Sequence, residues 1–179
     1  SAHLMSKIAT VLGDAADASE YLTLFEKVKA AWLSRYLTPD GFIVAQTQTA
    51  ALLALHFELL PEDKEDTVFE FLVKDIERRG WHLSTGFVGT PYMNHVLTER
   101  GRLDVAYKLL LQESWPSWLY SVTKGGTTIW ERWDGWTEEN GFQDAGMNSF
   151  NHYAYGAIGA WMYAHVAGIQ AAEPGYKKI

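Results

Sequence analysis

Helical periodicity is the feature of this sequence that most limits how the chain can fold. Between Asp14 and about Tyr36 the apolar side chains recur every three or four residues and so share one helix face: Tyr21, Leu24, Phe25, Val28, Trp32 and Tyr36. Similar segments follow at 47–60, from 61 to about 78, at 90–99, at 102–113, at 118–122 and from 148 or 149 to about 168. The pattern predicts an all-α fold of helix–loop–helix pairs in one domain.

Composition narrows the class of protein. The 179 residues are 47% hydrophobic, which predicts a folded domain and not a disordered chain. The formal net charge of −7 argues against nucleic acid or an anionic membrane as a partner, because both attract basic surfaces. Without cysteine, the chain can form no disulfide and no thiolate metal site. We find no apolar run of about 18 residues and no signal-peptide pattern, and the compartment stays open.

The first five residues, SAHLM, are typical of an expression-vector remnant. We therefore expect residues 1–5 to lie outside the fold and residues 6–179 to form the domain. His3 falls in this segment and is left out of the search for metal ligands.

The stretch from Gly125 to Trp136, GGTTIWERWDGW, is chemically the densest part of the chain. Its last seven residues hold three tryptophans, two carboxylates and an arginine, which is unusual for a solvated loop. A tryptophan ring offers a flat apolar face and one N–H donor, which suits the face of a sugar ring. The same composition would also suit a turn that lines the core and carries a structural arginine–glutamate pair. The residues alone leave both interpretations open.

Motifs for several other chemistries are missing from the sequence. There is no metal-ligand spacing such as HxxxH, no phosphate-binding loop and no dinucleotide fingerprint. There is also no GxSxG motif around a nucleophilic serine. We therefore expect neither a metal nor a cofactor.

Several motifs that occur in one order extend the signal beyond the tryptophan-rich stretch. TTIWERWDGW is similar to the signature of bacterial α-L-rhamnosidases, which are inverting glycoside hydrolases with an (α/α)6 barrel. Three further segments resemble the same family: TQTAALLALHFELLPED, HLSTGFVGTPYMNHVLTERGRLDVAYKLLLQESWPSWLYSV and SFNHYAYGAIGAWMYAHVAGI. The matches run from about Gly13 to Tyr176. The resemblance implies an array of α-hairpins that is part of an (α/α)6 toroid, a choice that periodicity alone does not make.

The resemblance also implies roles for Glu131 and His152, and the chemistry of the neighbouring residues adds further candidates. Glu131 matches the position of the family's general base, which activates the attacking water in inverting hydrolysis. His152 matches a histidine that contacts the rhamnose unit, and an imidazole can donate to a sugar hydroxyl or accept from it. Asp134 is a candidate to orient Arg132 or Glu131. The candidates for stacking on the sugar are Trp130, Trp133 and Trp136, of which we expect at least one to be a packing residue.

One departure from the family limits what the chain can do. The enzymes it resembles are several times longer, and their general acid lies upstream of the segment that matches Gly13. The chain therefore resembles only the C-terminal half of the catalytic domain. We expect little or no hydrolysis from it alone, because protonation of the leaving group is worth about 10²–10⁴ in rate. Half a toroid also exposes apolar surface, so we expect a homo-oligomer that covers the open face of the barrel.

Three functions stay open at this point. The first is a fragment of an α-L-rhamnosidase, whose ligand would be a rhamnose-containing glycoside and whose reaction would remove terminal α-L-rhamnosyl residues with inversion. The second is a non-catalytic carbohydrate-binding or assembly module of the same fold. The third is a helical glycosidase or lyase of another specificity. If the chain did hydrolyse a glycoside, the acids to test would be Asp134, Glu138, Glu139 and Asp144.

Overall fold

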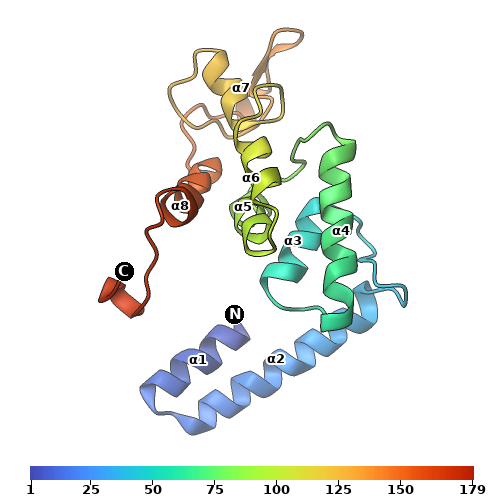
Figure 1. The fold of residues 1–179 in the computed structure, drawn as a ribbon, viewed down its shortest axis with the longest axis vertical. Coiled ribbons are helices and arrows are strands. Elements are labelled where there is room, and N and C mark those ends of the chain that lie inside the picture. The colour runs from blue at the N-terminus through green and yellow to red at the C-terminus, as the bar shows by residue number, and fades with distance from the viewer.

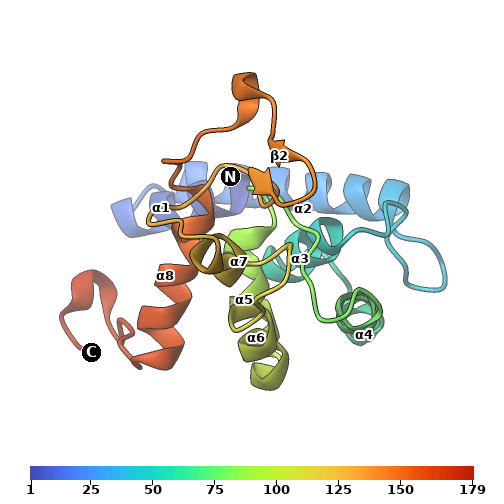
Figure 2. The ribbon, with the colours of Figure 1, turned by 90° about the horizontal axis from the view of Figure 1, so that it is seen from above.

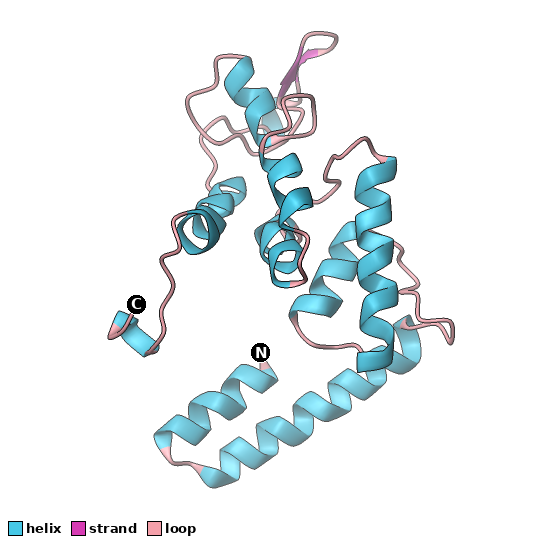
Figure 3. Ribbon diagram, viewed as in Figure 1, coloured by secondary structure: helices cyan, strands magenta, loops and turns pink.

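The computed structural model describes residues 1–179, and helices make up most of its regular structure (Figures 1 and 3). The first six helices pack as three consecutive pairs: α1 (Ala2–Leu12) with α2 (Ala15–Tyr36), α3 (Gln48–His56) with α4 (Glu62–Arg78), and α5 (Thr90–Glu99) with α6 (Leu103–Leu110). Helix α3 also packs on α5, which joins the second and third pairs. The predicted all-α fold of paired helices is confirmed. None of the helices is both long and apolar enough to cross a membrane.

The last third of the chain is less regular. Its elements are α7 (Trp118–Thr123), β1 (Trp136–Thr137), β2 (Gly141–Phe142), two 3-10 turns (Ala145–Met147 and Ala154–Ala157), α8 (Ile158–Trp161), a π-helical turn (Met162–Val166) and a last 3-10 turn (Pro174–Tyr176). The two strands pair antiparallel and form one small hairpin, drawn in magenta in Figure 3. Helix α8 and the turn before it pack against α5, so α5 lies at the centre of the molecule (Figure 2).

The core lies where α3, α4, α5 and α6 face one another. Each of these helices contributes apolar side chains at helical spacing, and Leu52, Leu72, Ile76 and Leu97 are completely buried. The helices begin where the sequence supplies start signals. The Thr47 hydroxyl accepts a hydrogen bond from the Ala50 N–H at 3.1 Å, and acidic residues fill the first turn of α4. Local start signals and the buried stripes therefore agree in this region.

Two helices that were predicted from the sequence extend less far in the structure. The segment predicted at 47–60 stops being helical after His56, because Glu58 takes up a left-handed conformation with φ 53°. The segment predicted at 102–113 ends at Leu110. Just beyond it the Gln112 side chain accepts a hydrogen bond from the Ser114 N–H at 3.2 Å, a local bond that competes with helix formation.

The last helix starts later than its apolar period predicts. Residues 149–152 were expected to open it, but the backbones of Ser149 and His152 instead bond to residues 129–131. Regular helical turns therefore begin only at Ala154. The polar segment 138–147, which precedes this helix, contains β2 and a 3-10 turn.

The N-terminal residues are part of the fold. Residues 2–5, which the sequence suggested lie outside it, form the first turn of α1. The imidazole of His3 stacks on the ring of Phe25 in α2, with centroids 4.6 Å apart. Leaving these residues out of the folded domain was wrong, and their origin stays a prediction.

Candidate active site

Two loops that are distant in sequence pair with each other and bring Glu131 and His152 to one place. The Glu131 N–H donates to the Ser149 carbonyl at 2.8 Å, and the His152 N–H donates to the Ile129 carbonyl at 2.9 Å. These two bonds hold residues 129–131 beside residues 149–152. The pairing brings the backbone segments of Glu131 and His152 side by side, although the two residues are 21 positions apart in the sequence.

The carboxylate of Glu131 is fixed at one oxygen and open at the other. Its Oε2 accepts a hydrogen bond from the Ser149 N–H at 2.7 Å, and no other group in the chain bonds to it. The side chain is half-buried at an open hollow of about 240 Å³, lined by Gly86, Phe87, Glu131, Arg132, Met147 and Tyr155. A carboxylate held in this way has a free acceptor oxygen with which it can take a proton from water.

His152 is held by aromatic stacking and by one hydrogen bond. Its ring stacks on Phe87 with centroids 4.7 Å apart and planes 13° from parallel, and on Tyr153 at 5.4 Å and 7°. Its Nδ1 accepts a hydrogen bond from the Ala154 N–H at 3.3 Å. In the neutral ring the proton must then be on Nε2, which makes Nε2 the donor that remains for a ligand.

Arg132 and Asp134 form a two-point ion pair beside the hollow. The Arg132 Nε donates to Asp134 Oδ1 at 2.9 Å and its Nη2 donates to Oδ2 at 3.0 Å. This bond to Asp134 is the main reason why the pKa of Arg132 is raised. Of the two orienting roles considered for Asp134, the structure shows the contact with Arg132. The pair borders a second hollow of about 300 Å³, which shares Gly86, Arg132 and Tyr155 with the first.

The three candidate tryptophans differ in their surroundings. Trp130 is only 8% exposed and meets the Phe150 ring edge-on, which leaves almost no free ring face. Trp133 stacks on Tyr155 with centroids 3.8 Å apart, and its Nε1 donates to the Thr85 carbonyl at 2.8 Å. Trp136 lies half-buried in β1 and lines neither hollow. Packing accounts for Trp130 and Trp133 in this structure, and sugar stacking by any of the three stays a prediction.

Two aromatic residues of the site were not singled out from the sequence. Phe87 supports His152, and Tyr155 lines both hollows beneath Trp133. Burial raises the pKa of the Tyr155 phenol, and the nearby charge of Asp134 raises it further, so the phenol stays neutral. Both residues lie within the longer family-like segments, next to glycine: Phe87 in TGFVG and Tyr155 in HYAYG. An aromatic residue next to glycine in a family-like segment was the sequence signal that could have identified both residues.

No other carboxylate around the hollow is free to act as an acid. Asp134 is bound to Arg132, and the Asp144 carboxylate caps a 3-10 turn by accepting from the Gly146 N–H at 2.7 Å. Glu138 bonds to Lys124, and this bond lowers the pKa of Glu138, which favours the ionised form over a proton donor. Glu139 is exposed and lines neither hollow.

Comparison with known proteins places this geometry in a family. The family model of the bacterial alpha-L-rhamnosidase 6 hairpin glycosidase domain matches residues 1–166. An α-L-rhamnosidase of Streptomyces avermitilis is 47% identical over 179 residues, which is 100% of this chain and 17% of that protein. An α-L-rhamnosidase of Formosa agariphila is 45% identical over 181 residues, covering 100% of this chain and 19% of that protein. The chain thus spans less than a fifth of the length of these relatives.

Solved structures agree with the sequence matches. The crystal structure of the Streptomyces avermitilis α-L-rhamnosidase complexed with L-rhamnose superposes with a TM-score of 0.94 at 47% identity, covering 98% of this chain and 17% of that one. The native enzyme from Aspergillus terreus gives a TM-score of 0.92 at 36% identity, covering 98% of this chain and 20% of that one. The hairpin array is accordingly part of an all-α toroid, and the chain belongs to the 6 hairpin glycosidase domain family of bacterial α-L-rhamnosidases.

Proposed function

We propose that this chain is the part of an α-L-rhamnosidase that supplies the general base, Glu131, for hydrolysis of terminal α-L-rhamnosyl residues with inversion. The observation that carries the proposal is the fixed Glu131 carboxylate, which has one oxygen bound to the Ser149 N–H and the other free at an open hollow. The named activity of the relatives supports rhamnosides as the substrate class.

In an inverting reaction the base and the acid act on opposite faces of the sugar. Glu131 would take a proton from water while the water oxygen bonds to the anomeric carbon. The bond from that carbon to the glycosidic oxygen breaks, and an acid protonates the leaving oxygen. Such pairs of carboxyl groups lie about 6.5–9.5 Å apart. The acids that border this site are engaged in other bonds, so we expect the isolated chain to hydrolyse ordinary rhamnosides poorly.

The sugar contacts that we propose follow from the donors and surfaces of the site. The Nε2–H of His152 would donate to a sugar hydroxyl, because Nδ1 is already occupied by the Ala154 N–H. A relative has been crystallised in complex with L-rhamnose, which supports rhamnose as the unit bound. Arg132, held by Asp134, would offer its remaining N–H groups as further donors at the hollow that Glu131 also lines.

A substrate that needs no acid allows the base to be tested alone. α-L-Rhamnosyl fluoride has a leaving group that departs without protonation but still requires an activated water. We expect the chain to hydrolyse it to β-L-rhamnose as the first product, seen by proton NMR, and Glu131→Gln to slow this by about 10²–10⁴. The exposed Glu139 provides a matched control, since Glu139→Gln should leave the rate unchanged.

Other outcomes would point away from Glu131. Equal rates for the chain and Glu131→Gln would remove Glu131 as the base, and α-L-rhamnose as first product would exclude inversion. Hydrolysis of an unactivated aryl rhamnoside at a comparable rate would mean that an acid is present, with Asp134 the first to test. Binding of L-rhamnose that is lost in His152→Ala, without hydrolysis of either substrate, would favour the alternative of a carbohydrate-binding module.

We also propose that copies of the chain associate through the first hairpin. Its helices expose large apolar side chains that nothing in the chain covers, among them Val11, Leu12, Leu24 and Val28. Such a surface favours association in water. Light scattering coupled to size-exclusion chromatography should give a mass above 20.2 kDa, and a monomer at high concentration would contradict this proposal.

A further inference from the structure

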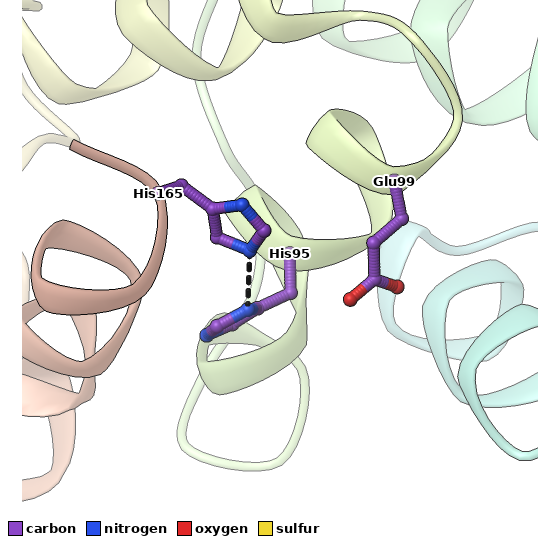
Figure 4. Close-up of side chains that lie close together, drawn as sticks. All are labelled: His95, Glu99 and His165. Carbon is purple, nitrogen blue, oxygen red and sulfur yellow. Dashed lines mark hydrogen bonds between the residues drawn. The ribbon is translucent and has the colours of Figure 1, made fainter. Parts of the chain in front are cut away.

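Three potential metal ligands meet at the contact between α5 and the C-terminal segment. His95 and Glu99 are one turn apart on α5, and His165 reaches them from the π-helical turn that follows α8 (Figure 4). The ligand atoms of the three side chains all lie within 4.8 Å of one another. None of the three lines the hollows at Glu131. The sequence suggested no metal site because His165 is 70 positions from His95, so no local spacing reveals the cluster.

The distance between the two histidines suits binding to one ion. His95 Nδ1 and His165 Nε2 are 3.2 Å apart, and the ring planes meet at 67°. Two imidazole nitrogens bound to a tetrahedral ion at 2.0–2.1 Å are roughly 3.3 Å apart. The Glu99 side chain is exposed, so it can turn to bring an oxygen closer to both nitrogens.

The backbone that presents His165 is unusual and firmly placed. The Ala167 N–H bonds to the Met162 carbonyl at 2.9 Å, which closes a π-helical turn, a feature found frequently at functional sites. Just before this turn, the buried Trp161 donates from Nε1 to the Thr98 hydroxyl of α5 at 2.9 Å. This bond joins α8 to α5 close to both histidines, since Trp161 is four residues before His165 and Thr98 is three residues after His95.

The two histidines by themselves fit two interpretations, a metal site or a hydrogen bond between the rings. A simple hydrogen bond between the rings would account for the histidines without Glu99, because Glu99 bonds to neither of them. The role of Glu99 therefore distinguishes the two interpretations.

We propose that His95, Glu99 and His165 form a binding site for a divalent transition-metal ion, with Zn²⁺ as the ion that best suits two imidazoles and a carboxylate. The ion would fasten the C-terminal segment to α5. Imidazole and carboxylate are ordinary Zn²⁺ ligands, and a chain without cysteine offers no thiolate to compete with them.

The test is a titration of the full chain with ZnCl₂ after treatment with a chelator. Calorimetry at pH 7.5 should show one Zn²⁺ per chain, and thermal unfolding should shift upward by about 5 °C at a hundredfold excess over the dissociation constant. Glu99→Gln and His165→Gln should each weaken binding at least about tenfold. Glu20→Gln is the matched control, because Glu20 is an exposed glutamate of α2, lies outside the cluster and should leave binding unchanged.

Cobalt gives a second measurement that is independent of stability. Co²⁺ held by three protein ligands in a tetrahedral site has a strong visible absorption, which should appear with the chain and disappear with Glu99→Gln. Circular dichroism without metal confirms that each variant is folded, and the exposed Glu99 makes its substitution the least disruptive. The proposal is overturned if the folded chain binds no Zn²⁺, or if Glu99→Gln and His165→Gln bind it as tightly as the unmodified chain does.

Discussion

The first hairpin (α1 and α2) and the central helices carry the same kind of apolar pattern, but only the central helices bury it. In α3, α4 and α5 the stripe is buried, and Leu52, Leu72 and Leu97 have no exposed surface. In α2, the longest helix, no residue is buried, and Leu24 remains 46% exposed. Figure 1 shows α1 and α2 projecting from the rest of the molecule. Apolar residues that recur every 3.6 positions thus predict a helix and its apolar face, but they do not identify which part of the protein covers that face.

The first hairpin holds its shape through contacts of its own. The Asp14 carboxylate accepts from the Asp17 N–H at 3.0 Å and so caps α2, and the Ser6 hydroxyl donates to the Ala18 carbonyl at 2.8 Å across the hairpin. Its attachment to the rest is concentrated near the end of α2, where Trp32 packs on the core. This difference predicts that the two regions contribute unequally to global stability.

The largest expected effect is a matched pair of leucine truncations. Leu97→Ala should lower the free energy of unfolding by about 2–5 kcal/mol, because it removes a fully buried side chain and leaves a cavity. At protein concentrations too low for copies to associate, Leu24→Ala should change it by less than about 0.5 kcal/mol, because the side chain is already partly in water. Urea unfolding at one protein concentration measures both.

A large loss of stability in Leu24→Ala would contradict the expectation that the apolar face of α2 is uncovered. It would mean that the face of α2 is buried in solution. A loss that grew with protein concentration would assign that burial to a second copy and would support the proposed oligomer. A small loss at every concentration would leave the face of α2 uncovered.

The next effect concerns a buried polar network that α2 lacks. Asp75 of α4 accepts from Gln48 Nε2 at 3.0 Å, and the Oε1 of the same Gln48 accepts from the Ser84 N–H at 2.6 Å. Arg78 and Arg79 also bond to the Asp75 carboxylate. Asp75→Asn should cost about 1–3 kcal/mol in urea unfolding. The loss stays moderate because the two arginine side chains are substantially exposed and can be rehydrated.

The same carboxylate should make part of the stability depend on pH. Burial acts to raise the pKa of Asp75, but hydrogen bonds from Arg79, Arg78 and Gln48 outweigh it and lower the pKa below 3.8. The unfolded chain therefore binds this proton first as the pH falls. The stabilisation is present above about pH 4 and is lost as the pH falls through the folded-state pKa. Asp75→Asn should flatten that acid limb, and an unchanged acid limb would exclude this role.

Sequence reasoning succeeded where structure depends on neighbours along the chain. The bounds expected for α2 and α5 agree closely with the structure, because caps and periods are local signals. It failed for the last helix, because the pairing of residues 149–152 with 129–131 overrides local helical preference. At the site, Glu131 and His152 were identified from motif resemblance, whereas the approach of their two backbone segments depends on long-range pairing. The contact of His165 with His95 depends on a π-helical turn that no residue pattern in the sequence indicated.

The smallest expected effect is the loss of a helix cap. In the core it should lower global stability, and in the first hairpin it should increase local opening only. Thr47 caps α3 and Asp14 caps α2 through equivalent bonds, to the Ala50 N–H at 3.1 Å and the Asp17 N–H at 3.0 Å. Loss of either cap should cost about 1 kcal/mol. Thr47→Ala should lower global stability in urea by that amount, because α3 belongs to the core. Asp14→Ala should instead speed hydrogen exchange within α2 and leave the urea midpoint unchanged, because α2 can open by itself.

Serine at either position restores a capping hydroxyl, so Thr47→Ser and Asp14→Ser are the controls and should recover most of each loss. If Asp14→Ala lowered the urea midpoint as much as Thr47→Ala, the first hairpin would unfold together with the core. The exposed surface of α2 would then not mean that α2 unfolds independently of the core. If exchange in α2 rose alone, the hairpin would be an independent unit that keeps its helical form through caps and through α1, without a buried face towards the core.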